Sequence, residues 1–112
     1  MTQTTKLTPA EREEIMQRFT DVWGVDAEIK IAIEEMAELT KELCSTWRDN
    51  NKANPEALME NLHQRIREEI ADVLVTVGNL RLIFGADKVD KTIDAKLQRG
   101  AARLEKWLKE HQ

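Results

Sequence analysis

Four acidic side chains form two pairs whose spacing could hold a metal ion. Glu35 and Glu38 are three residues apart, and Glu69 and Asp72 repeat this spacing further along the chain. On a helix, residues three apart are neighbours on one face, where like charges destabilise the helix by a few tenths of a kcal/mol. A divalent cation bound among the carboxylates would remove that repulsion. Mg²⁺ suits such a site because it prefers oxygen ligands.

A cation held by carboxylates favours phosphate chemistry, because it can bridge phosphate oxygens and lower the pKa of a bound water. At about 100° of rotation per residue, the four acids fall at or near the edge of the apolar face of their helices. Partial burial there adds a desolvation cost that a cation would offset. Two alternatives remain open. The acids are a solvated face, as we interpret Glu11 and Glu14, or they form ion pairs with Lys41, Arg65 or Arg67.

The elements that position these acids are predicted to be four helices. Thr8 is a candidate N-cap, Pro9 suits the first helical position, and Glu11 completes a capping box. Gly24 and Gly85 are suited to end helices. The polar stretch 48–54 predicts a loop. The predicted helices run from Thr8 to Gly24, from an N-cap near Asp26 to about Trp47, from about Pro55 to Phe84, and from about Asp87 onward.

Apolar residues repeat every three or four positions in each helix, which predicts an all-α fold, an antiparallel four-helix bundle. We expect one domain over residues 1–112, with a flexible N-terminus at 1–7. The stripe expected to pack the second helix consists of Ile29, Ala32, Ile33, Met36, Leu43 and Trp47. The seam of the third helix consists of Met59, Leu62, Ile66, Ile70, Val73, Val77, Leu80 and Phe84.

The third helix also carries a second apolar stripe, opposite its main seam. A helix with two apolar faces is sandwiched between partners. We therefore expect a homo-oligomer, either a homodimer or a homotetramer. The alternative is that the first and fourth helices cover both faces within one chain. The second stripe consists of Ala71, Val75, Gly78 and Leu82.

Composition and charge exclude several classes of protein. The 112 residues are 41% hydrophobic and 34% charged, which is globular composition. The net charge of −4 argues against nucleic acid polymers and anionic membranes as partners. No apolar run approaches the ~20 residues of a membrane span. A single cysteine, Cys44, suits a reducing compartment, so a cytoplasmic location is expected.

The two acid pairs in this order resemble the MazG-like branch of the all-α nucleoside triphosphate pyrophosphohydrolases. The family pattern is E-x-x-E on one helix and E-x-x-D on the next long helix, followed by a hydrophobic run ending in Asn-Leu, here Asn79-Leu80. The resemblance covers roughly residues 25–105. Ala71 departs from a frequent glycine, and the interval between the two pairs is slightly longer than usual.

The resemblance implies an enzyme that hydrolyses a (deoxy)nucleoside triphosphate to the monophosphate and pyrophosphate. Glu35, Glu38, Glu69 and Asp72 would bind Mg²⁺, with Mn²⁺ as a substitute. The catalytic candidates are Glu34 and Glu68, which would support the ligands or orient the attacking water. Two alternatives are a non-catalytic helical oligomerisation module and a nucleotide-binding regulator that hydrolyses slowly.

Further candidates would bind the substrate. Lys96, Arg99 and Arg103 share one helical face and would meet the phosphates, and the alternative is a solubilising stripe. Asn79 would contact ribose or phosphate, or else make a hydrogen bond in the core. Trp23 or Trp47 would stack on the base, although both lie on apolar stripes and core packing is favoured.

Overall fold

The computed structural model describes the backbone of residues 5–49 and 55–112 and the side chains of 5–45 and 60–112. Within these ranges the chain is helical and has no strand, which confirms the all-α prediction. None of the described helices is long and apolar enough to cross a membrane. Residues 1–4 of the predicted N-terminus, most of the predicted loop and the side chain of Trp47 lie outside the described parts. The helices are α1 (Pro9–Trp23), α2 (Val25–Asp49), α3 (Pro55–Phe84) and α4 (Ala86–Glu110).

The predicted start of α1 is confirmed. The backbone N–H of Glu11 donates to Thr8 Oγ1 at 3.1 Å, and the backbone N–H of Thr8 donates to Glu11 Oε1 at 2.9 Å. Gly24 and Gly85 adopt φ angles of 89° and 113°, a region that favours glycine, and each lies between two helices. The predicted N-cap at Asp26 is wrong, because α2 begins at Val25, directly after Gly24, and Asp26 lies in its first turn.

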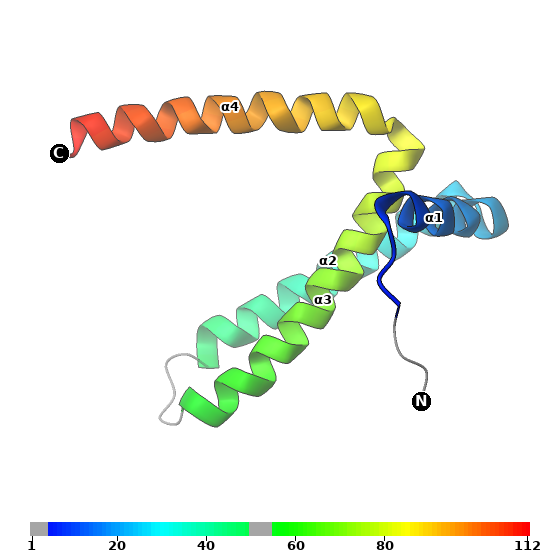
Figure 1. The fold of residues 1–112 in the computed structure, drawn as a ribbon. Coiled ribbons are helices and arrows are strands. Elements are labelled where there is room, and N and C mark those ends of the chain that lie inside the picture. The colour runs from blue at the N-terminus through cyan, green and yellow to red at the C-terminus, as the bar shows by residue number, and fades with distance from the viewer. Residues whose placement is uncertain (1–4, 50–54) are drawn as a thin grey trace.

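The helices α2 and α3 lie side by side and antiparallel, and they form the hairpin that makes most of the packing in the chain (Figure 1). Its buried apolar residues are Ala32, which is 0% exposed, and Leu62, which is 2% exposed. The prediction for α2 needs a correction, because Ile33 and Leu43 are 60% and 49% exposed while Glu28 is buried. The face that α2 turns toward α3 is therefore the edge that carries acids, rather than the centre of its apolar stripe.

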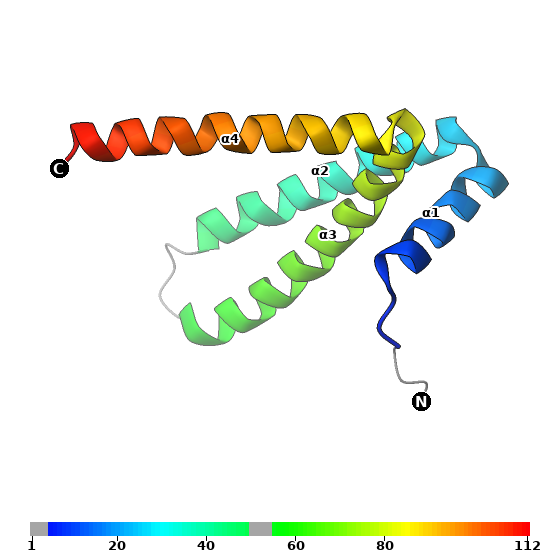
Figure 2. The same ribbon diagram turned by 45° about the horizontal axis from the view of Figure 1, so that its top comes forward.

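The helix α1 packs across the end of the hairpin where α2 begins and α3 ends, against both helices (Figure 2). A Cβ atom at Gly78 would lie 3.0 Å from the Sδ of Met16, so the absence of a side chain there permits the close approach of α1. The second apolar stripe of α3 is therefore covered by α1 at some positions and exposed at others. Gly78 is covered by α1 of the same chain, whereas Val75 remains 43% exposed.

The helix α4 leaves the hairpin as an arm. It contacts α3 alone among the described helices, and it diverges from α2 and α3 in both views (Figures 1 and 2). No residue of α4 is buried. The predicted four-helix bundle is therefore not closed within one chain. The chain turns at Gly85, whose positive φ redirects it between α3 and α4.

Arg81 holds the elbow between α3 and α4. Its Nε donates to Asp90 Oδ1 at 2.6 Å and its Nη2 donates to Asp90 Oδ2 at 2.5 Å, while its Nη1 donates to Glu13 Oε1 of α1 at 2.9 Å. A bidentate arginine–carboxylate pair has a fixed geometry and so specifies orientation. The guanidinium of Arg81 lowers the pKa of Asp90, and the two carboxylates raise the pKa of Arg81. These contacts join three helices.

This clamp predicts a dependence of stability on acid pH. Because the pKa of Asp90 is lower in the folded protein, the unfolded chain binds a proton first as pH falls. The clamp stabilises the fold fully above the ordinary pKa of aspartate, about 4. It is lost as pH falls further, through the lowered pKa. Asp90→Asn should lower the melting temperature at pH 7 and reduce its fall between pH 5 and pH 3. Asp94→Asn, at an exposed aspartate of α4, is the control and should reproduce the wild-type pH profile.

Candidate metal centre

Three of the four predicted metal ligands meet between α2 and α3. One carboxylate oxygen from each of Glu35, Glu69 and Asp72 lies within 4.8 Å of the other two. Glu35 and Glu69 are half-buried, and Asp72 is exposed. Two oxygens bound to one Mg²⁺ are at most about 4.2 Å apart, since each lies about 2.1 Å from the ion. A small rotation of these side chains would bring them to a shared cation.

Within this carboxylate cluster, Glu69 has the environment least favourable to a negative charge. Its pKa is raised first by desolvation and then by the negative charges of Asp72, Glu35, Glu38 and Glu42. Its Oε2 atom is buried and has no hydrogen-bond partner in the described part of the chain. A buried carboxylate oxygen without a partner is costly. A cation supplies what this oxygen lacks, so the residues present fit a divalent metal.

The other predicted acids surround the cluster. Glu38 is exposed and is not among the three converging ligands, although its charge acts on Glu69. Glu34 and Glu68 are also exposed. The side chain of Gln64 donates from Nε2 to Glu68 Oε1 at 3.0 Å, which orients that carboxylate. The structure thus brings Glu35, Glu69 and Asp72 together and leaves the other acids at the rim.

Asn79 lies in the core rather than at the surface. It is 1% exposed, its Nδ2 donates to Glu28 Oε2 at 2.7 Å, and its Oδ1 accepts from Thr20 Oγ1 at 2.8 Å. This arrangement corresponds to the core hydrogen bond that the sequence left as the alternative. It joins α1, α2 and α3 at the end of the hairpin where α2 begins and α3 ends.

Sequence reasoning missed Glu28, which is only 4% exposed. Its Oε1 is buried without a hydrogen-bond partner in the described residues, and its Oε2 accepts from Asn79. One signal was available. Glu28 precedes Glu35 by two helical turns and therefore lies on the same face of α2, the face that meets α3.

The predicted phosphate-binding residues are separated from the cluster within one chain. Lys96, Arg99 and Arg103 are exposed on the part of α4 that extends beyond the elbow. They share one helical face, as expected from their spacing. The arm that carries them does not contact α2, which supplies Glu35.

A groove of about 450 Å³ runs between α1 and α3. Ala71 and Val75 line it from α3 and flank Asp72 in the sequence, and Arg12 and Phe19 line it from α1. Its volume is in the range of small-molecule sites, about 300–1,000 Å³. The groove is predominantly apolar.

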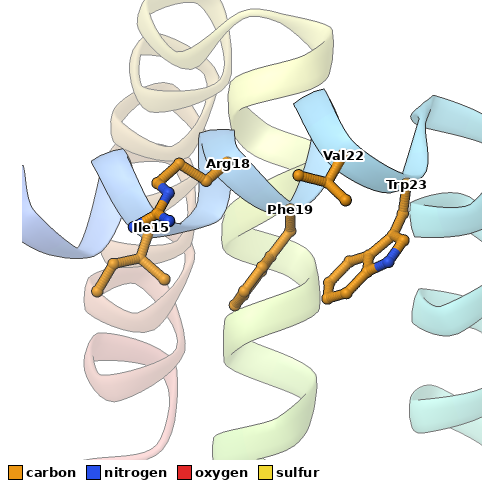
Figure 3. Close-up of a pocket in the computed structure, with 5 residues that line it drawn as sticks. All are labelled: Ile15, Arg18, Phe19, Val22 and Trp23. Atoms are coloured by element: carbon orange, nitrogen blue, oxygen red, sulfur yellow. The ribbon is translucent and has the colours of Figure 1, made fainter.

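A second depression, of about 250 Å³, is lined by residues of α1 (Figure 3). Ile15 and Arg18 line it together with Phe19 and Trp23, whose rings stack with their centroids 5.5 Å apart. Trp23 is 59% exposed, so the interpretation of this residue as core is wrong.

Comparison of the chain with models of protein families, with curated proteins and with solved structures gives no match.

Proposed function

We propose that the chain is a Mg²⁺-dependent hydrolase of the MazG-like kind, which converts (deoxy)nucleoside triphosphates to the monophosphate and pyrophosphate. The observation that carries this proposal is the convergence of Glu35, Glu69 and Asp72 from neighbouring helices, with the buried Oε2 of Glu69 lacking a partner. Hard oxygen ligands on rigid helices are the set that Mg²⁺ prefers. Mn²⁺ would bind the same set.

Some of the acidic residues would bind the metal ion, and others would position the attacking water. Glu35, Glu69 and Asp72 would hold the ion, and a rotation of Glu38 would add its carboxylate from one helical turn away. When bound, the ion would neutralise phosphate charge and lower the pKa of a bound water. Glu68, which Gln64 holds in place, would accept a hydrogen bond from the attacking water and orient it. Glu34 is the second candidate for that role.

The groove between α1 and α3 would receive the nucleoside part of the substrate. Its apolar lining suits a base and a sugar, and its wall includes Ala71, which precedes Asp72 in α3. The phosphates would then extend toward the carboxylates, with Lys96, Arg99 and Arg103 as their basic partners. In one chain these residues lie on the free arm, so we propose that the enzyme works as a homodimer or a homotetramer.

The two alternative functions make different use of the same acids. In a helical interaction module the acids would be neutralised by ion pairs, and Arg65 does contact Glu42 at 3.3 Å. The buried oxygen of Glu69 has no such partner in the described residues, which favours a metal site. A nucleotide-binding regulator would keep the metal and the nucleotide but release little product.

One assay separates the three functions. The protein is incubated with a panel of nucleoside and deoxynucleoside triphosphates, with and without Mg²⁺, and the products are separated by ion-exchange chromatography. We expect monophosphate and pyrophosphate, formed only with the metal. Diphosphate and orthophosphate as products would contradict the proposed bond cleavage. A rise in melting temperature with nucleotide and Mg²⁺ but without product would indicate the regulator, and no response to either would indicate the interaction module.

A further inference from the structure

The arm α4 has an apolar face that nothing in the described chain covers. Val89 is half-buried where α4 leaves α3, and the next apolar residues continue its face at helical spacing. An amphipathic helix gains its stability by burying such a face. The exposed fractions on this arm face are 46% for Ile93, 66% for Leu97, 56% for Leu104 and 44% for Leu108.

The α2–α3 hairpin has an uncovered apolar face of its own, on the side opposite the carboxylate cluster. Glu35 and Glu42 on one edge of α2 meet Glu69 and Arg65 on one edge of α3. Because α2 and α3 are antiparallel, the edge of α2 opposite these acids lies beside the corresponding opposite edge of α3. The exposed fractions on this hairpin face are 60% for Ile33, 41% for Met36, 49% for Leu43, 40% for Ile70 and 40% for Val77.

The elbow keeps the two faces of one chain apart. Arg81 follows Val77 by one helical turn, so α4 departs from the side of α3 that carries the hairpin face. The bonds from Arg81 to Asp90 and to Glu13 fix that departure at an open angle. In Figures 1 and 2 the arm and the hairpin diverge from this point.

We infer that two copies of the chain exchange arms, so that the arm face of each copy packs on the hairpin face of the other. Each contact between an arm face and a hairpin face covers both surfaces, and a symmetric dimer contains two such contacts. The charges are complementary. The arm α4 has seven Lys and Arg residues against five acidic ones, whereas α2 and α3 together have twelve acidic residues against six basic ones. The exchange specifies a contact of the homo-oligomer proposed above. Its test is separate from catalysis, because the two faces contain neither the carboxylate cluster nor Lys96, Arg99 and Arg103.

The first test is the molar mass in solution, measured by light scattering on the full-length chain. We expect the wild type to be a dimer or a larger even assembly, and Leu97→Glu to reduce its mass at least twofold while circular dichroism shows retained helix. The matched control is Gln98→Glu, the next residue, which faces away from the arm face and should leave the mass unchanged. A monomeric wild type, or a Leu97→Glu variant of unchanged mass, would overturn the exchange.

The second test distinguishes exchange from closure of the arm onto its own hairpin. Cys44, the sole cysteine, is exposed on α2 next to Leu43. Two kinds of chain are mixed and oxidised. One keeps Cys44, and the other is longer because of a tag and carries Cys44→Ser together with Leu97→Cys, Leu104→Cys or Leu108→Cys. A cross-linked species of mixed mass from at least one position is expected. If no mixed species forms from any position, the exchange is overturned. An internal disulfide in a single chain that carries Cys44 and one of the same arm substitutions would then show that the arm closes on its own hairpin.

Discussion

Replacing Glu69 by glutamine is expected to abolish nucleotide hydrolysis, with a loss of at least about 100-fold in kcat. The substitution keeps the volume of the side chain and removes the charge that would hold the cation. Glu69 is central because its carboxylate lies within reach of both Glu35 and Asp72 and has a buried oxygen without a partner in the described residues. Steady-state assays at saturating Mg²⁺ measure the effect.

The same variant should separate catalysis from folding. Its neutral side chain removes the desolvation cost and the repulsion that raise the pKa of Glu69, so the metal-free variant should melt no lower than the wild type. It should also lose the rise in melting temperature that Mg²⁺ produces in the wild type. Glu14→Gln, at an exposed acid of α1, is the matched control and should retain both activity and the response to Mg²⁺. Activity close to that of the wild type in Glu69→Gln would remove this residue from the site.

Replacing Asn79 by alanine is expected to give the largest loss of stability of any single polar substitution discussed for this chain, about 3 kcal/mol. The change removes the hydrogen bonds to Glu28 and Thr20 and leaves the buried carboxylate of Glu28 without its partner. It also opens a small cavity where three helices meet. Urea denaturation monitored by circular dichroism gives the free energy of unfolding.

Asn61→Ala is the control, because it removes an exposed asparagine from the same helix. It should change the free energy of unfolding by less than about 0.5 kcal/mol. Asn79 was also a candidate for contact with ribose or phosphate. If that role is correct and the core role is not, Asn79→Ala will raise KM and leave the unfolding curve unchanged, a result that would contradict our assignment.

The local features of the fold could be predicted from the sequence because they depend on neighbouring residues. The capping box at Thr8 and the helix ends at Gly24 and Gly85 follow from backbone chemistry within a few positions. The meeting of Glu35 with Glu69 and Asp72 was also predictable. Acids three residues apart share a helix face, and consecutive antiparallel helices bring such faces together.

The long-range features could not be predicted in this way. Periodicity shows that a helix has an apolar stripe, but it does not show which edge of the stripe meets the neighbouring helix. The exposure of Ile33 and the burial of Glu28 illustrate this limit. Similarly, the open direction of α4 depends on bonds from Arg81 to residues on two other helices. Such contacts join positions whose spacing in the sequence carries no signal.

The central claim is that the carboxylates between α2 and α3 share one divalent cation. The most direct measurement is an anomalous difference map from a crystal of the protein grown with Mn²⁺, which scatters anomalously and takes the ligands of Mg²⁺. We predict a peak coordinated by Glu35, Glu69 and Asp72, with ligand oxygens about 2.2 Å from the ion. A map without that peak, in which the three carboxylates turn separately into solvent, would contradict the metal site and the hydrolase proposed from it.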